Sequence, residues 1–95
     1  MSSSLLWITF VGETEGERKR IFTTIETDNL GEVKHLEQIK KDIYRILLLT
    51  SADVYDLHTI LHQAGNFPIN IKEEDGHTVW SHRRYNEFFP NRAAE

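Results

Sequence analysis

The chain of 95 residues contains no cysteine, and this absence excludes three kinds of chemistry. Without thiols it can form no disulfide bond, no thiolate nucleophile and no cysteine-ligated zinc site. Small secreted domains often depend on disulfides for stability, so a chain without them is more typical of a reducing compartment. We therefore expect a cytoplasmic protein.

Long hydrophobic runs are also missing. The apolar stretch Leu5–Val11 is only seven residues long, and no basic segment precedes it. A membrane-spanning helix needs about 20 apolar residues, and a signal peptide begins with a basic region. We expect neither of these, and no membrane partner. Five glycines and two prolines likewise exclude a collagen-like or linker-like chain.

Basic charge is in the minority, with 11 Lys and Arg against 15 Asp and Glu and a net charge of −4. A duplex-binding domain usually gathers a basic face, so this balance argues against nucleic acid as the partner. A content of 39% hydrophobic and 11% aromatic residues is that of a folded domain with one core. We predict a single domain over residues 1–95, with a frayed tail over 90–95.

The hydrophobic pattern predicts an α+β fold with two helices and a mixed sheet of about five strands, in the order ββαβαββ. Ile21, Thr23 and Ile25 alternate as in a strand. Asn29 and Glu32 have the spacing of a capping box, and the apolar residues that follow recur at helical steps. The predicted elements are strands over 5–11 and 18–27, a helix over 30–41, a strand over 43–49, a helix over 52–64, and strands over 67–72 and 77–81.

The first 40 residues resemble the opening of a ubiquitin-like β-grasp. The segments LLWITFV and RIFTTIE correspond to its hairpin, and DNLGEVKHLEQIKK corresponds to the capped helix that follows. The resemblance implies that this helix lies across the hairpin.

The richest candidate surface is the segment from Trp80 to Phe89, which holds four aromatic residues and two adjacent arginines. Tryptophan, tyrosine and arginine dominate interface hot spots because each buries a large area and keeps a polar group. The alternative is that these aromatic side chains close the core. The predicted partner-binding residues are Trp80, Arg83, Arg84, Tyr85 and Phe88.

A second basic cluster, Arg18, Lys19 and Arg20, begins the predicted second strand. Charges of this kind guard edge strands against unwanted pairing, and they can also steer an acidic partner or accompany strand addition.

His58 and His62 lie four residues apart on the predicted second helix, the spacing of an intrahelical metal pair. Thr59 stands where the metalloprotease motif requires glutamate. The alternative is that the two histidines border the buried side of that helix, so we predict no metal and no cofactor.

No sequence motif indicates a reaction, and we predict no catalytic residues. The leading hypothesis is a small intracellular, non-enzymatic domain that binds another protein as an adaptor, inhibitor or regulatory subunit, with a homodimer as one form of this activity. The alternative is a nucleic-acid-associated regulator that uses the two basic-aromatic clusters.

Overall fold

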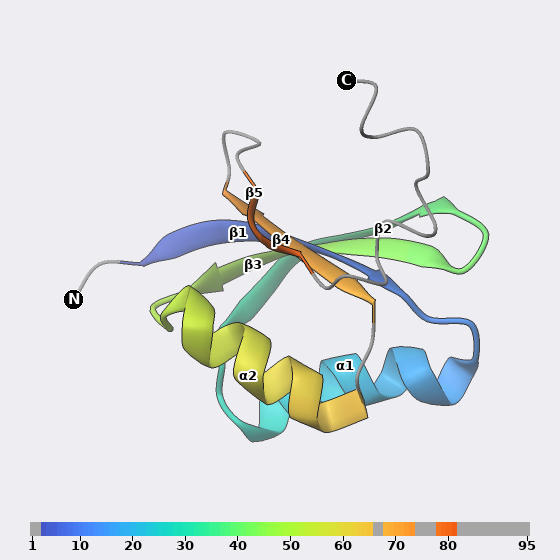
Figure 1. Cartoon of the computed structure of the whole chain (residues 1–95), viewed down its shortest axis with the longest axis horizontal. Coiled ribbons are helices and arrows are strands. Elements are labelled where there is room, and N and C mark those ends of the chain that lie inside the picture. Colours follow the sequence, from blue (N-terminus) through green and yellow to red (C-terminus); the bar gives the residue numbers. More distant parts are fainter. Residues whose placement is uncertain (1–2, 66–67, 74–77, 82–95) are drawn as a thin grey trace.

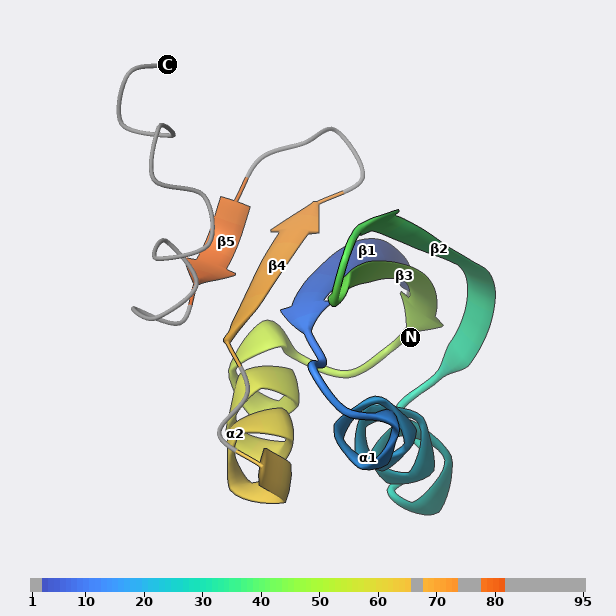
Figure 2. The ribbon, with the colours of Figure 1, turned by 90° about the vertical axis from the view of Figure 1, so that its right-hand side faces the viewer.

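The computed structural model describes residues 3–65, 68–73 and 78–81. Two helices lie together against one face of an antiparallel sheet, and the opposite face carries no helix among these residues (Figures 1 and 2). We call these the helix face and the open face. In chain order the elements are β1 (Ser4–Val11), α1 (Glu15–Thr27), β2 (Glu32–Lys40), β3 (Ile43–Thr50), α2 (Val54–Gly65), β4 (Ile69–Glu73) and β5 (Thr78–Ser81).

The strands lie in the order β2-β3-β1-β4-β5, and every neighbouring pair is antiparallel. As a result β1 runs parallel to β2 with β3 between them, and β3 runs parallel to β4 with β1 between them. The first six elements thus form two interlocked split β-α-β units, which is the ferredoxin-like topology. This topology serves many unrelated functions, so the function must be argued from the residues.

The core lies between the sheet and the two helices. Along β1 the side chains of Leu6, Ile8 and Phe10 alternate toward the helix face, where all three are buried. Ile8 is opposite Ile46 on β3 and Ile71 on β4, so the central strands share one apolar layer. Helix residues complete the cluster with Ile21, Ile25, Leu57 and Leu61.

The α+β class and the two helices are confirmed, but the prediction of a strand over 18–27 is wrong because these residues belong to α1. The helix begins with a capping box at Thr14: its hydroxyl accepts from the backbone N–H of Glu17 at 3.1 Å, and the Glu17 carboxylate accepts from the N–H of Thr14 at 3.1 Å. Ile21 and Ile25 are buried one helical turn apart.

The prediction of a helix over 30–41 is also wrong, because Glu32–Lys40 is strand β2. Asn29 does not begin a helix; it ends α1 in the left-handed region, with φ of 52°. The N–H of Asn29 donates to the carbonyl of Glu26, and the N–H of Leu30 donates to that of Ile25. This is a Schellman motif, so Asn29 takes the position after the helix that favours glycine or asparagine.

These two corrections change the element order to βαββαββ, and the predicted hairpin and β-grasp-like opening are not found. The mixed sheet is also corrected, since all neighbouring strands are antiparallel. Later elements agree better: the strand predicted over 43–49 is β3, and the helix predicted over 52–64 is α2. Neither described helix has the length and apolar content needed to cross a membrane.

Candidate functional site

Strand β2 is the most exposed regular element of the described chain. It lies at one end of the sheet, pairs with β3 on its inner side, and has no described strand on its outer side (Figure 2). Eight of its nine residues are exposed. Val33, Leu36 and Ile39 are 38%, 48% and 46% exposed, and they are three of the four large apolar side chains exposed in the described residues.

A groove runs beside this strand where β2 passes the end of α1. Phe22 and Ile25 on α1 and Val33 on β2 supply its apolar lining, and Glu26 and Glu32 supply acidic groups. Val33 and Leu36 lie on the helix face of β2, because they pair with Leu48 and Ile46 of the core. The apolar groove and the exposed side chains of Val33 and Leu36 therefore lie on the same side of the sheet.

Two features guard the outer edge of β2 against indiscriminate pairing. The pairing with β3 shifts register between Val33 and His35 and again between Gln38 and Lys40, so the strand carries two bulges. Lysines stand at positions 34 and 40, and the Lys34 ammonium lies 3.4 Å from the Glu32 carboxylate. Bulges and lysines on an edge strand hinder its pairing with strands of other chains. A partner strand therefore has to be compatible with the bulges and the charges of β2.

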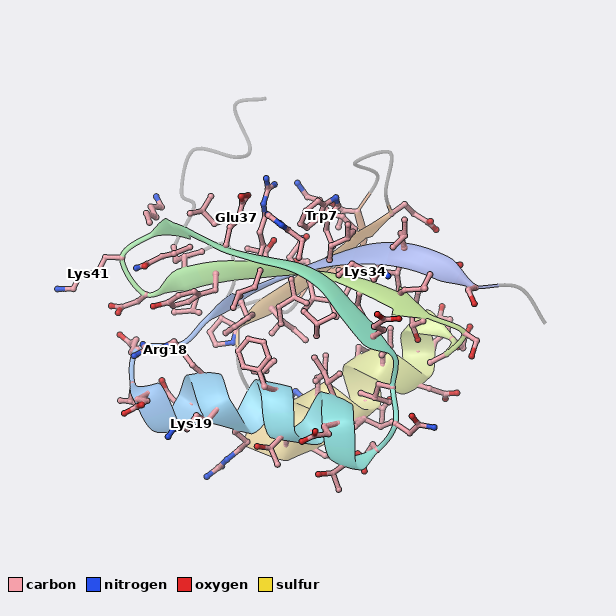
Figure 3. The ribbon with its side chains drawn as sticks, turned by 180° about the vertical axis from the view of Figure 1, so that it is seen from behind. Trp7, Arg18, Lys19, Lys34, Glu37 and Lys41 are labelled. Atoms are coloured by element: carbon pink, nitrogen blue, oxygen red, sulfur yellow. The ribbon has the colours of Figure 1, made fainter. Side chains whose placement is uncertain are left out.

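The open face carries a connected cluster of four polar and aromatic residues, which we call the open-face cluster. It comprises Trp7 on β1, His35 and Glu37 on β2, and Arg45 on β3. The Arg45 guanidinium lies over the Trp7 ring, 4.4 Å from its centroid, and forms an ion pair with Glu37. The His35 ring meets Trp7 edge to face at 6.1 Å, and its Nε2 lies 3.3 Å from Glu37 Oε1. Figure 3 shows Trp7 and Glu37 on the side of the sheet away from the helices.

Glu37 is the electrostatic centre of this cluster. Its contacts with His35 and Arg45, in that order of effect, hold the pKa of its carboxyl below the ordinary value. The side chains of Glu37 and Arg45 are 35% and 40% exposed, so water screens this pair and its main effect is to fix the direction of Arg45.

Only part of the open face is accessible. Thr9 on β1 lies opposite Asn70 on β4, and these residues are 6% and 3% exposed although they belong to the open face by register. The accessible part lies toward β2, where His35 is exposed and Trp7 is half-buried.

The predicted basic cluster is separated by the fold. Arg18, Lys19 and Arg20 lie on α1 rather than at the head of a strand, which corrects that prediction. Arg18 donates to the carbonyl of Gly12 at 2.7 Å, and Arg20 donates to that of Ala64 at 3.3 Å. Lys19 pairs with Glu15 at 3.5 Å, and Figure 3 shows Arg18 on the sheet side of α1 with Lys19 on its outer side. The three cations have different partners.

Of the predicted partner-binding residues, the structure describes only the backbone of Trp80. The backbone of Trp80 belongs to β5, where it pairs with Ile71. Arg83, Arg84, Tyr85 and Phe88 lie outside the described residues. That prediction stays a prediction.

Among the residues that the structure describes, the two histidines on α2 belong to no group with enough ligands for a metal site. His58 is half-buried with its ring centroid 5.9 Å from that of Tyr55, and His62 is exposed. Within residues 3–65, 68–73 and 78–81 no group of three or more histidine, aspartate or glutamate side chains could hold a metal ion.

Comparisons of the chain with protein-family models, with curated proteins and with solved structures found no match.

Proposed function

We propose that this chain is a non-enzymatic domain that binds another protein along the outer edge of β2. The observation that carries the proposal is the exposure of Val33, Leu36 and Ile39 on one edge strand. A patch of exposed apolar side chains marks an interaction surface, whereas single exposed apolar residues are ordinary. Because no described strand pairs with its outer side, β2 also offers a partner backbone donors and acceptors along part of that edge.

The partner that fits such an edge is an extended segment of protein that adds to the sheet as a further strand. In strand addition, backbone hydrogen bonds supply affinity, and pockets for alternate side chains supply specificity. The groove lined by Phe22, Ile25 and Val33 lies beside β2 and can take an apolar side chain from such a segment. An adaptor, inhibitor or regulatory subunit of the cytoplasm is the kind of protein that works in this way, and the lack of cysteine favours that compartment.

The test is affinity capture of the tagged chain from its native cell lysate after nuclease treatment. Leu36→Glu puts a charge at the middle of the edge, and Tyr55→Glu is the matched control because Tyr55 is 73% exposed on α2. Both variants must keep the far-UV circular dichroism spectrum of the wild type. We expect proteins bound by the wild type to be lost with Leu36→Glu and kept with Tyr55→Glu. Equal binding by both variants would refute β2 as the binding edge.

A second candidate is single-stranded nucleic acid on the open face. Trp7 and Arg45 lie on the two central strands of that face, and an aromatic ring beside a cation is the arrangement that stacks bases and holds phosphate. However, Arg45 already covers the Trp7 ring and is paired with Glu37. Contacts to phosphate lose affinity steeply between about 50 and 200 mM salt. Oligonucleotide binding whose affinity falls steeply over that range would favour this candidate.

A further inference from the structure

We infer that the strand that adds to β2 is β2 of a second copy of this chain, antiparallel, with the two-fold axis at Leu36. The inference rests on the proposed function and names its partner. A two-fold axis perpendicular to the sheet brings the same strand from each copy into contact, and position 36 of one copy then lies opposite position 36 of the other. Each residue i therefore lies opposite residue 72 − i, which follows from the numbering of β2 alone.

The sequence of β2 is complementary to itself in this register. The two ends of the strand form pairs of opposite charge, the positions next to the ends form apolar pairs, and the central position forms an apolar pair with itself. Glu32 lies opposite Lys40, Val33 opposite Ile39, Lys34 opposite Gln38, His35 opposite Glu37, and Leu36 opposite Leu36. Opposite charges and apolar pairs directly across two strands each stabilise a sheet, whereas like charges destabilise it.

At the pairs whose residues all have a partner on β3, the faces of the strand agree with the same register. Directly opposed residues of an antiparallel pair must point to the same face. Pairing with β3 places Glu32, His35, Glu37 and Lys40 on the open face, since their partners include Leu47 and Arg45 of that face, and it places Leu36 on the helix face. The two charged pairs thus form on the open face, and the leucine pair forms on the helix face beside the groove.

The two neighbouring registers form less favourable pairs across the strands. An axis one residue later, at position 37, puts Glu37 opposite Glu37, so two carboxylates meet on the open face. An axis one residue earlier, at position 35, puts His35 opposite His35 and brings Glu32 of the open face against Gln38 of the helix face. These two neighbouring registers are therefore disfavoured, whereas the register centred on Leu36 brings no like charges opposite each other.

The dimer joins the two open-face clusters into one surface. His35 of one copy lies opposite Glu37 of the other, so the Trp7–Arg45 pairs of both copies belong to one continuous sheet. A single pair of nine-residue strands is a small interface. We expect a dissociation constant of about 1–100 μM, because interfaces at the low end of the size range are weak.

Charge exchange tests both the partner and the register, and sedimentation velocity over a concentration series gives the readout. Glu32→Lys puts two lysines opposite each other at both ends of the interface, and Lys40→Glu puts two glutamates there. Each variant alone should associate about tenfold more weakly than the wild type. An equimolar mixture of the two variants restores an opposite-charge pair at each end, and it should form a heterodimer about as tight as the wild-type dimer.

Tyr55→Glu serves again as the control variant and should associate like the wild type. A wild-type chain that stays monomeric up to about 1 mM, or a mixture that associates no better than its components, would overturn the inference. In either case the proposed function would still hold if, in the capture experiment, the Leu36→Glu variant fails to capture proteins that the wild type captures. If Leu36→Glu loses nothing there and the mixture does not associate, both proposals fail.

Discussion

The guanidinium of Arg45 lies over the indole ring of Trp7, with its Cζ atom 4.4 Å from the ring centroid. These residues come from the adjacent central strands β3 and β1, and Glu37 on β2 holds Arg45 through an ion pair. One cation thus connects three strands on the open face. Because this contact depends on tertiary pairing, it reports whether the sheet is assembled as described.

Removing that cation should expose Trp7. We expect Arg45→Ala to increase iodide quenching of Trp7 fluorescence and to lower the free energy of unfolding by about 0.5–1 kcal/mol, the usual size of a partly exposed cation–π contact. A Trp80→Phe background leaves Trp7 as the only indole, since the chain has two tryptophans. Lys41→Ala at the β2–β3 turn is the control, and an equal change in that variant would contradict the contact.

Glu37 should make stability depend on pH in the acid range. The folded-state pKa of its carboxyl lies below the ordinary value of 4.5, first because of His35 and then because of Arg45. The ionised form is therefore favoured by folding, and its contribution is present above pH 4.5 and is lost as the pH falls through the lowered folded-state pKa. In urea titrations the wild type should lose more stability than Glu37→Gln below that pH. Parallel curves for the two proteins would contradict the coupling.

Gly31 should be intolerant of any side chain. Its φ is 157°, and a Cβ atom there would lie 2.3 Å from the carbonyl oxygen of Leu49. We expect Gly31→Ala to lower the free energy of unfolding, measured in urea, by more than about 2 kcal/mol, because the backbone at Gly31 and the carbonyl of Leu49 must both move. Gly16→Ala is the matched control: its Cβ would meet only Thr14 Oγ1 at 3.9 Å, and alanine in a helix should stabilise the fold by about 0.5 kcal/mol. Similar effects at both positions would contradict the close approach of Gly31 to the Leu49 carbonyl of β3.

The second half of the described chain could be predicted from local patterns. The run from Ile43 to Leu49 is almost continuously apolar, as a central strand requires, and it is β3. Leu57 and Leu61 are one helical turn apart on α2, and both are buried. In these elements the local preference and the tertiary structure agree.

The strand predicted over 5–11 is β1, but the next two elements could not be predicted, because each of their patterns is compatible with two structures. Val33, Leu36 and Ile39 recur every three residues, which is typical of a helix. In β2 the bulge between Val33 and His35 adds a residue to the strand, so Val33 and Leu36 share a face three residues apart. Asn29 also fits two positions, because asparagine is favoured both before a helix and directly after one.

The open-face cluster had no local signal at all. Trp7, His35, Glu37 and Arg45 come from three strands, and only the strand order brings them together. A prediction that assigned residues 30–41 to a helix could not place His35 and Glu37 beside β3. The order of the strands was the missing information.

Disulfide formation at position 36 tests most directly whether β2 is a protein-binding edge that a second copy occupies. Because the chain has no cysteine, Leu36→Cys carries a single thiol. In the register centred on Leu36 the two Cα atoms at this position are about 4.5–5.5 Å apart, within the range of a disulfide. Gln38→Cys is the control, because its two copies lie four residues apart along the strands, about 13 Å.

Under mild oxidation Leu36→Cys should give a covalent dimer on a non-reducing gel while Gln38→Cys remains monomeric. Equal crosslinking of the two variants, or none in either, would contradict the pairing of β2 with its own copy.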